Sequence, residues 1–183
     1  MESFQGQFLI ATPQLRDPNF FRTVVLLVQH DSNGALGLIL NRPAEISIEK
    51  AWEQVSDKPC NREGFLYIGG PCEGVLMALH THESASEVEV VPGLHFSAAA
   101  PNIEWLVEEG ELPLRFFVGY SGWTAGQLES ELEEGSWMLA PATADLAFSP
   151  DDELWSTIVR QINWSKTAAT LNPKLIPPDP SVN

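Results

Sequence analysis

Residues 8–43 read FLIATPQLRDPNFFRTVVLLVQHDSNGALGLILNRP. Two apolar runs lie in this stretch, Val24–Val28 and Leu36–Leu40, and a turn containing Asn33-Gly34 joins them. An Asn-Gly pair supplies the positive φ angles that a tight hairpin turn requires. The second run ends before Pro43, which has no N–H for further pairing in a sheet. The stretch therefore predicts a β-hairpin. Both of its strands are almost continuously apolar, so both are expected to be covered on two faces.

Hydrophobic periodicity and capping residues predict the elements on either side of this hairpin. Ser47 is a suitable N-cap for one helix, and Thr124 and Gln127 have the spacing of a capping box for another. Further strands are predicted at 7–11, 65–68, 75–80, 87–91, 94–97, 114–120 and 137–140, and helices at 48–56, 101–109, 124–134 and from 149 onward. Hairpins dominate this order, which favours an α+β fold with a mainly antiparallel or mixed sheet over a parallel doubly wound fold.

The length of 183 residues predicts one domain over residues 1–165, followed by a proline-rich tail at 166–183 that we expect to be disordered. No apolar run approaches the length needed to span a bilayer, and the N-terminus lacks a basic signal region, so a cytoplasmic location is expected. Cys60 and Cys72 do not form a CxxC pair. We interpret them as reduced thiols, with a redox role left open.

The charge of the chain limits its partners. Ten Lys and Arg residues stand against 25 Asp and Glu residues, which gives a net charge of −15. Nucleic-acid binding depends on clustered basic residues, and here these residues are scattered. Direct nucleic-acid binding and attachment to an anionic membrane are therefore not expected. The partners that fit are an unidentified protein or a small anionic ligand.

Two glycine-rich segments partly match catalytic or phosphate-binding motifs. Residues 119–123 read GYSGW and resemble a G-x-S-x-G nucleophile elbow, but Trp123 replaces the final glycine. Gly69-Gly70-Pro71 has N–H groups to offer to an anion, yet no complete phosphate-binding motif follows it. Tight turns are the preferred interpretation of both segments. No cofactor is predicted, and the absence of a complete catalytic motif argues against an enzyme.

The histidines and the clustered carboxylates are weaker indications of a functional site. His80 and His82 have the spacing that places two side chains on one face of a strand, and a third metal ligand would have to come from His30 or His95. Hydrogen-bonded histidines at strand ends are the preferred interpretation, so no metal site is predicted. A run of acids between 129 and 134 is interpreted as the solvated face of a helix: Glu129, Glu131, Glu133 and Glu134.

The remaining candidate site lies at the outer ends of the predicted hairpin. Arg22 and Thr23 precede its first strand, and Asn41 and Arg42 follow its second, so the two pairs should lie side by side. The arginines could pair internally with Asp17 or Asp31, which we prefer, or bind a carboxylate or phosphate. The candidate ligand-binding residues are Arg22, Thr23, Asn41, Arg42, Gly69, Gly70 and His80.

Taken together, these segments closely resemble the YqgE/AlgH family. The shared positions include Leu9-Ile10-Ala11, Arg22-Thr23-Val24-Val25, Asn41-Arg42-Pro43, Gly69-Gly70-Pro71, Gly119-Tyr120 and Gly126-Gln127-Leu128-Glu129. The resemblance covers about residues 6–164. It implies an α+β fold whose sheet curls into a barrel-like core, with about four helices outside. It carries over no catalytic residue, and one family member is labelled a regulator of alginate synthesis.

Two functions follow from these observations. The first is a non-enzymatic regulatory or protein-interaction module of unknown biochemical activity, with indirect effects on transcription. The alternative is a protein that binds, or acts on, a small anionic metabolite through the region of Arg22 and Arg42. We prefer the first from the sequence, because the chain is acidic and lacks a catalytic motif.

Overall fold

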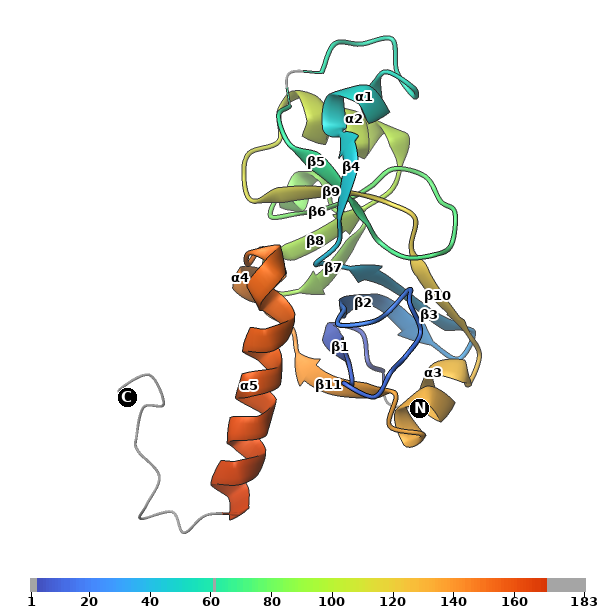
Figure 1. Cartoon of the computed structure of the whole chain (residues 1–183). Helices are drawn as coiled ribbons and strands as arrows, with labels where there is room; N and C mark the ends of the chain where they lie inside the picture. The colour runs from blue at the N-terminus through green and yellow to red at the C-terminus, as the bar shows by residue number, and fades with distance from the viewer. Residues whose placement is uncertain (1–2, 61, 171–183) are drawn as a thin grey trace, which may run out of the picture.

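The computed structural model describes residues 3–60 and 62–170, and within them the chain forms two β-sheets flanked by helices (Figure 1). Sheet one is antiparallel, with the order β10-β3-β2-β1-β11. Its strands are β1 (Gln7–Ala11), β2 (Val24–Asp31), β3 (Gly34–Ile39), β10 (Ser121–Thr124) and β11 (Trp137–Pro141). The α+β class is therefore confirmed.

Sheet two is mixed and has the order β4-β5-β9-β6-β8-β7. Its strands are β4 (Pro43–Ser47), β5 (Phe65–Ile68), β6 (Met77–His80), β7 (Val88–Val91), β8 (Leu94–Ser97) and β9 (Leu114–Val118). The β5–β9 pair is parallel and its other pairs are antiparallel. Neither sheet closes on itself in the described part of the chain, so the expected barrel-like core is wrong. Two open sheets that pack face to face take its place.

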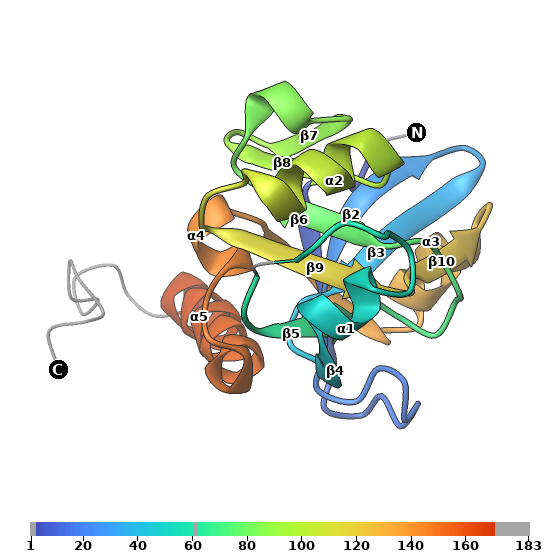
Figure 2. The same ribbon diagram turned by 90° about the horizontal axis from the view of Figure 1, so that it is seen from above.

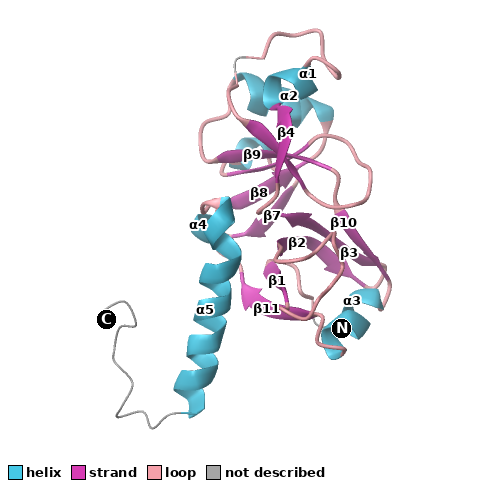
Figure 3. Ribbon diagram, in the orientation of Figure 1, coloured by secondary structure: helices cyan, strands magenta, loops and turns pink. Residues whose placement is uncertain are grey.

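The helices lie outside the two sheets. They are α1 (Ile48–Trp52), α2 (Ala100–Glu108), α3 (Gln127–Glu133), α4 (Ala144–Ala147) and α5 (Asp151–Thr170), together with a short 3₁₀ turn, η1 (Glu83–Ala85). Figure 2 shows α1 and α2 lying over the strands of sheet two. Figure 3 shows α3 at the far side of sheet one, and α5 running along the edge of the molecule past β11. Among the described residues, no helix is long and apolar enough to cross a membrane.

Three apolar cores hold these layers together. The largest lies between the sheets and joins Leu26 of sheet one to Leu79 and Phe117 of sheet two. Leu154 and Ile158 attach α5 to this core. The second core packs α1 and α2 against the outer face of sheet two, and the third packs α3 against the outer face of sheet one. Because buried apolar area is the main source of folding stability, this arrangement stabilises both sheets from both sides.

The predicted hairpin is confirmed as β2 and β3. Leu26 pairs with Leu38 in register, and a bulge follows Leu27. Leu26 faces the core between the sheets, while Leu27 faces the core under α3. The almost continuous apolar pattern thus reflects a strand with two buried faces, as expected.

Several boundaries differ from the sequence predictions. Helix α1 ends at Trp52 rather than at residue 56, and α3 begins at Gln127 after Gly126, whose φ is 77°. Residues 121–124, expected to form a turn and a helix cap, form the edge strand β10. Helix α5 continues to Thr170, past the expected start of the tail at 166, and the rest of that expected tail lies outside the described residues.

Candidate ligand-binding groove at Arg22

The outer ends of the β2–β3 hairpin are joined by the side chain of Asn41. Its Oδ1 accepts a hydrogen bond from the Val24 N–H at 2.9 Å, and its Nδ2 donates to the Arg22 carbonyl at 2.9 Å. Thr23 is fully buried, and its hydroxyl donates to the Phe20 carbonyl at 2.9 Å. The predicted proximity of the two segments is confirmed. Both side chains, however, use their polar groups to hold the backbone rather than to face a ligand.

Arg42 also holds the backbone. Its guanidinium donates to the carbonyls of Pro18 (3.0 Å) and Phe21 (3.4 Å), which ties the β1–β2 loop to the hairpin. Among the described residues, no carboxylate pairs with it. Asp17 instead accepts a hydrogen bond from a backbone N–H two residues further along the chain, and Asp31 does the same. The preferred prediction, internal ion pairing of the two arginines with these acids, is therefore wrong.

Arg22 behaves differently from Arg42. Its backbone is left-handed, with a φ of 53°, which is unusual for any residue except glycine and asparagine. Its guanidinium lies over two aromatic rings, 5.3 Å from the centroid of Phe21 and 5.4 Å from that of Trp155. The side chain is exposed and makes no hydrogen bond or ion pair with a described residue. Stacking therefore holds the guanidinium in place, and its five N–H donors remain available to bind a ligand.

Arg22 lines a groove of about 610 Å³ between the hairpin ends and the start of α5. The other lining residues that matter for recognition are Asn41, Asp151, Asp152, Trp155 and Ser156. Trp155 is fixed because its indole N–H donates to the Ala11 carbonyl at 2.9 Å. The groove thus has a rigid aromatic wall, a guanidinium at one side and two carboxylates from the first turn of α5.

The two carboxylates are held differently. Asp151 accepts a hydrogen bond from the Tyr67 hydroxyl at 3.0 Å through Oδ2, and its Oδ1 lies 3.3 Å from the guanidinium of Arg115. Burial, with a further contribution from the hydrogen bond to Asp151, raises the pKa of Tyr67, so the phenol remains a donor. Asp151 Oδ1 is buried and, apart from this ion pair, has no hydrogen-bond partner among the described residues. Asp152 is exposed and makes no hydrogen bond or ion pair within the described chain.

Gly69 and Gly70 do not face this groove. A side chain at Gly69 would come within 2.3 Å of the Gly119 carbonyl oxygen, and one at Gly70 within 2.3 Å of the Tyr120 backbone. The Gly69 carbonyl accepts hydrogen bonds from the Ile39 N–H at 2.8 Å and from a serine hydroxyl. These glycines allow two backbone segments to cross closely. Their role is structural, but the segment does not form the tight turn preferred from the sequence.

His80 lies in sheet two, away from the groove. The His82 N–H donates to its Nδ1 at 3.2 Å, so the ring proton is on Nε2, which donates to Ser97 Oγ at 2.9 Å. Burial, reinforced by the neighbouring rings of His95 and His82, lowers the pKa of His80 to about 4. The His80 and His95 ring centroids are 5.9 Å apart. No three potential ligand side chains in the described ranges are arranged to hold a metal ion.

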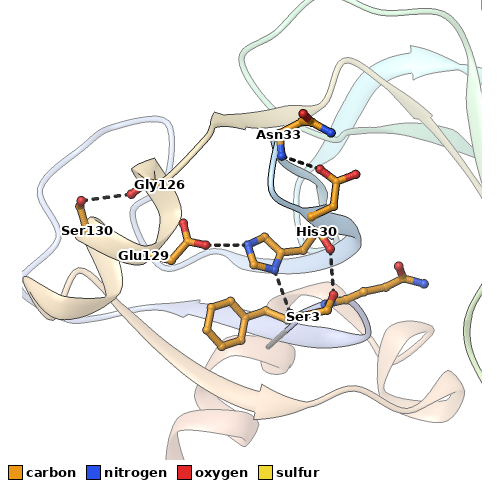
Figure 4. Close-up of polar contacts among 9 residues, drawn as sticks. Ser3, His30, Asn33, Gly126, Glu129 and Ser130 are labelled. Atoms are coloured by element: carbon orange, nitrogen blue, oxygen red, sulfur yellow. Dashed lines mark hydrogen bonds and ion pairs between the residues drawn. The ribbon is translucent and has the colours of Figure 1, made fainter. Parts of the chain in front are cut away.

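His30 is a buried residue of β2, and Figure 4 shows its polar contacts. The Phe4 N–H donates to its Nδ1 at 3.0 Å, and its Nε2 lies 3.0 Å from Oε1 of Glu129 on α3. A neighbouring acid, Glu131, accepts hydrogen bonds from the indoles of Trp123 (2.9 Å) and Trp137 (2.8 Å). The interpretation of the acids at 129–134 as a solvated face is therefore wrong for two of its four members.

The sequence does not single out Trp155, Asp151 or Tyr67 as site residues. The apolar stripe of α5 indicates only that Trp155 faces the core, and acids at 151 and 152 are typical of the first turn of any helix. Each of the three lies more than 20 positions from the hairpin ends, and no local motif links them. The packing of α5 brings Trp155 and Asp151 to Arg22, and Tyr67, on β5, is linked to this site by its hydrogen bond to Asp151.

Comparison with known proteins agrees with this fold. A UPF0301 protein of Chlorobaculum tepidum is 39% identical over 165 residues, which cover 85% of this chain and 84% of that protein. A UPF0301 protein of Streptomyces avermitilis is 36% identical and covers 100% of this chain and 97% of its own length.

Two solved structures share the fold. The solution structure of the AlgH protein from Pseudomonas aeruginosa matches with a TM-score of 0.73 and 29% identity, over 94% of this chain and 92% of that one. A crystal structure of a Corynebacterium diphtheriae protein matches with a TM-score of 0.68 and 25% identity, over 88% of each chain. The model of the AlgH-like family, a family of unknown function, matches residues 8–167. The chain therefore belongs to the AlgH-like family.

Proposed function

We propose that this protein binds a small anionic metabolite in the groove at Arg22. The single observation that carries the proposal is the state of the Arg22 side chain. Its guanidinium is stacked on Trp155 at 5.4 Å, exposed to the groove, and unpaired with any described acid. An arginine held in this way presents a planar set of donors that matches a carboxylate or a phosphate.

The backbone of Arg22 supports the same conclusion. A left-handed conformation at a residue other than glycine costs about 1–2 kcal/mol. Such strain is concentrated at binding and catalytic sites, where the surrounding structure maintains it. Here Asn41 maintains it, because its Nδ2 donates to the Arg22 carbonyl. The hairpin ends therefore serve to position the guanidinium, and the Asn41 amide makes the hydrogen bonds that join them.

The carboxylates that line the groove further define the class of ligand. Asp151 Oδ1 makes an ion pair but no hydrogen bond in the described chain, and Asp152 is exposed beside it. Both carboxylates are acceptors when ionised. The Asp151 Oδ1 atom is buried, so Asp152 is the accessible acceptor. A ligand that contacts both Arg22 and Asp152 carries a carboxylate or phosphate for Arg22 and a hydroxyl or amino group for Asp152. A hydroxy acid, an amino acid or a sugar phosphate has this combination.

We propose binding rather than catalysis at this groove. The hydroxyl of Ser156 donates to the Glu153 carbonyl at 3.0 Å, and no described histidine or carboxylate contacts that hydroxyl as a base. The groove supports the second of the two functions weighed from the sequence. A regulatory role for this protein would then act through occupancy of the groove, with any effect on transcription indirect.

Thermal unfolding of the full chain tests the proposal. The probes are inorganic phosphate, citrate, lactate, serine, glucose 6-phosphate and a nucleoside monophosphate. A ligand at 100 times its Kd adds about 2.7 kcal/mol of stability, which corresponds to a rise in Tm of roughly 5–10 °C for a domain of this size. A rise with at least one anionic probe is expected, and glucose, which lacks the anionic group, should have no effect.

Arg22→Gly is the diagnostic variant. Glycine accepts the left-handed backbone, so the unliganded protein should remain folded, while the shift caused by the anionic probe should disappear. Arg16→Gln removes an exposed arginine from the preceding loop, outside the groove, and should leave the shift intact. The proposal is overturned if no anionic probe raises the Tm, or if Arg22→Gly retains the full effect.

A further inference from the structure

A second groove, of about 390 Å³, lies between α1, α2 and the loop that precedes β6. It is lined mainly by apolar side chains, which include Trp52, Val55, Val75, Leu76 and Ile103. Its volume lies within the range of small-molecule sites. It shares no lining residue with the Arg22 groove, so what it binds is independent of the function proposed above.

Trp52 gives this groove a specific polar requirement. The residue is 4% exposed, and its buried indole N–H has no hydrogen-bond acceptor among the described residues. Three other indoles of the chain have one, on a carboxylate or a backbone carbonyl: Trp123, Trp137 and Trp155. Buried donors in folded proteins are almost always paired. The unpaired donor at the wall of a groove therefore indicates a missing acceptor.

The Trp52 N–H is itself buried, so a ligand acceptor reaches it only when side chains at the groove wall move. Val55 and Val75 line the same groove and are 65% and 64% exposed. Because each is mostly in solvent, it can change rotamer without disturbing the buried core. The aromatic face of Trp52 and the flanking valines then provide the apolar contacts, and the N–H provides the single directional one.

The rim of the groove decides the charge of the ligand. Glu104 lies at the rim and forms an ion pair with Lys58, which also lies 3.1 Å from Glu108. Two carboxylates thus share one ammonium group, which leaves a local negative charge. An anionic molecule is disfavoured here, in contrast to the Arg22 groove.

We propose that the α1–α2 groove is a binding site for a small uncharged molecule that has an apolar body and a carbonyl acceptor, which the indole N–H of Trp52 recognises. Such a ligand buries the exposed valine surfaces and pairs the orphaned donor at the same time. A molecule with a carboxylate in place of the carbonyl would meet the charge of Glu104 and Glu108.

Titration of the ¹⁵N-labelled full chain with acetanilide tests this assignment. Acetanilide is the probe because it combines a phenyl ring with a neutral amide carbonyl. The indole N–H signal of Trp52, identified as the one missing from Trp52→Phe, should shift saturably at millimolar concentrations. Phenylacetate, which carries a carboxylate, should bind at least tenfold more weakly.

Three variants test separately the indole N–H, the apolar wall of the groove and a control position outside it. Trp52→Phe retains an aromatic ring and should weaken acetanilide binding about tenfold, measured on the remaining groove signals, which is the effect of one lost hydrogen bond. Val75→Glu places a charge in the groove at an exposed position and should abolish binding. Leu112→Glu introduces the same charge at a residue that is 81% exposed and outside the groove lining, and should change nothing.

Several results would overturn the assignment. One is a Trp52 signal that does not respond to acetanilide in the wild-type chain. Equal binding by wild type and Val75→Glu would show that the probe sits elsewhere. Unchanged affinity in Trp52→Phe would remove the indole N–H as the recognising group, and preference for phenylacetate would contradict the proposed neutral ligand.

Discussion

The Nε2 atom of His30 lies 3.0 Å from Oε1 of Glu129, although the two residues are 99 positions apart. Since the Phe4 N–H donates to the other ring nitrogen, Nε2 carries the ring proton and donates a hydrogen bond to the carboxylate. His30 thus joins three segments: the N-terminal residues, β2 and α3. Both ring nitrogens of His30 therefore hold parts of the chain together.

Glu129→Ala should destabilise the protein by about 1–3 kcal/mol, because it leaves the buried N–H of His30 without an acceptor. Urea unfolding measures the loss. Hydrogen exchange at the Phe4 amide should accelerate as well. Glu133→Ala removes an exposed acid from the same helix and should change the free energy of unfolding by no more than about 0.5 kcal/mol. Equal effects of the two substitutions would contradict the structural role of Glu129.

Glu131 serves two indoles at once. Glu131→Ala leaves the N–H groups of Trp123 and Trp137 unpaired, so we expect a loss of about 2–4 kcal/mol in the free energy of unfolding. Glu131→Gln keeps an acceptor oxygen, so its free energy of unfolding should fall by less than that of Glu131→Ala. The indole N–H signals of both tryptophans should move in either variant. Glu134→Ala is the exposed control, and the prediction fails if it is as damaging as Glu131→Ala.

His80 should make stability depend on pH. Its pKa is lowered from 6.5 to about 4 in the folded protein, so between these values the unfolded chain binds more protons. The contribution is fully present above pH 6.5 and is lost as pH falls toward 4. It amounts to something on the order of 3 kcal/mol, since a tenfold change in proton affinity corresponds to about 1.4 kcal/mol.

The free energy of unfolding, measured with urea between pH 7.5 and 4.5, checks this prediction. His80→Gln retains a polar side chain that does not titrate, and its stability should decline less steeply over this range than that of the wild type. Parallel curves for the two proteins would show that His80 does not carry the effect.

Gly69→Ala tests whether the glycine pair is needed for packing. The new methyl group would meet the carbonyl oxygen of Gly119 at 2.3 Å, and backbone cannot move aside as a side chain can. We expect a loss of more than about 2 kcal/mol in a thermal or urea unfolding experiment. Gly74→Ala meets mainly the side chain of Tyr120, at 3.1 Å, and should be much milder. If Gly69→Ala were as mild as Gly74→Ala, the close backbone crossing would not be what requires glycine at this position.

The sequence predicted much of the fold because the relevant signals are local. The Asn33-Gly34 turn between two apolar runs was enough to predict the β2–β3 hairpin, and Ser47 was correctly predicted to cap α1, accepting from the Lys50 N–H at 3.2 Å. The strand β10 was missed, since its pairing partner is β3, more than 80 residues earlier. The barrel-like core, which was expected from the family resemblance, is wrong because the edge strands of neither described sheet pair with each other to close it.

In the candidate site, too, some features follow from local sequence signals and others depend on tertiary packing. The sequence by itself determined that Arg22 and Asn41 would meet at the end of a hairpin, because the register of two antiparallel strands follows from their turn. Only the tertiary structure decided that the Arg22 guanidinium stacks on Trp155 without an ion-pair partner, while the Arg42 guanidinium donates its hydrogen bonds to backbone carbonyls. The physical reason is that the apolar face of α5 packs into the core between the sheets, and that long-range burial alone carries Trp155 and the Asp151 carboxylate to the hairpin ends.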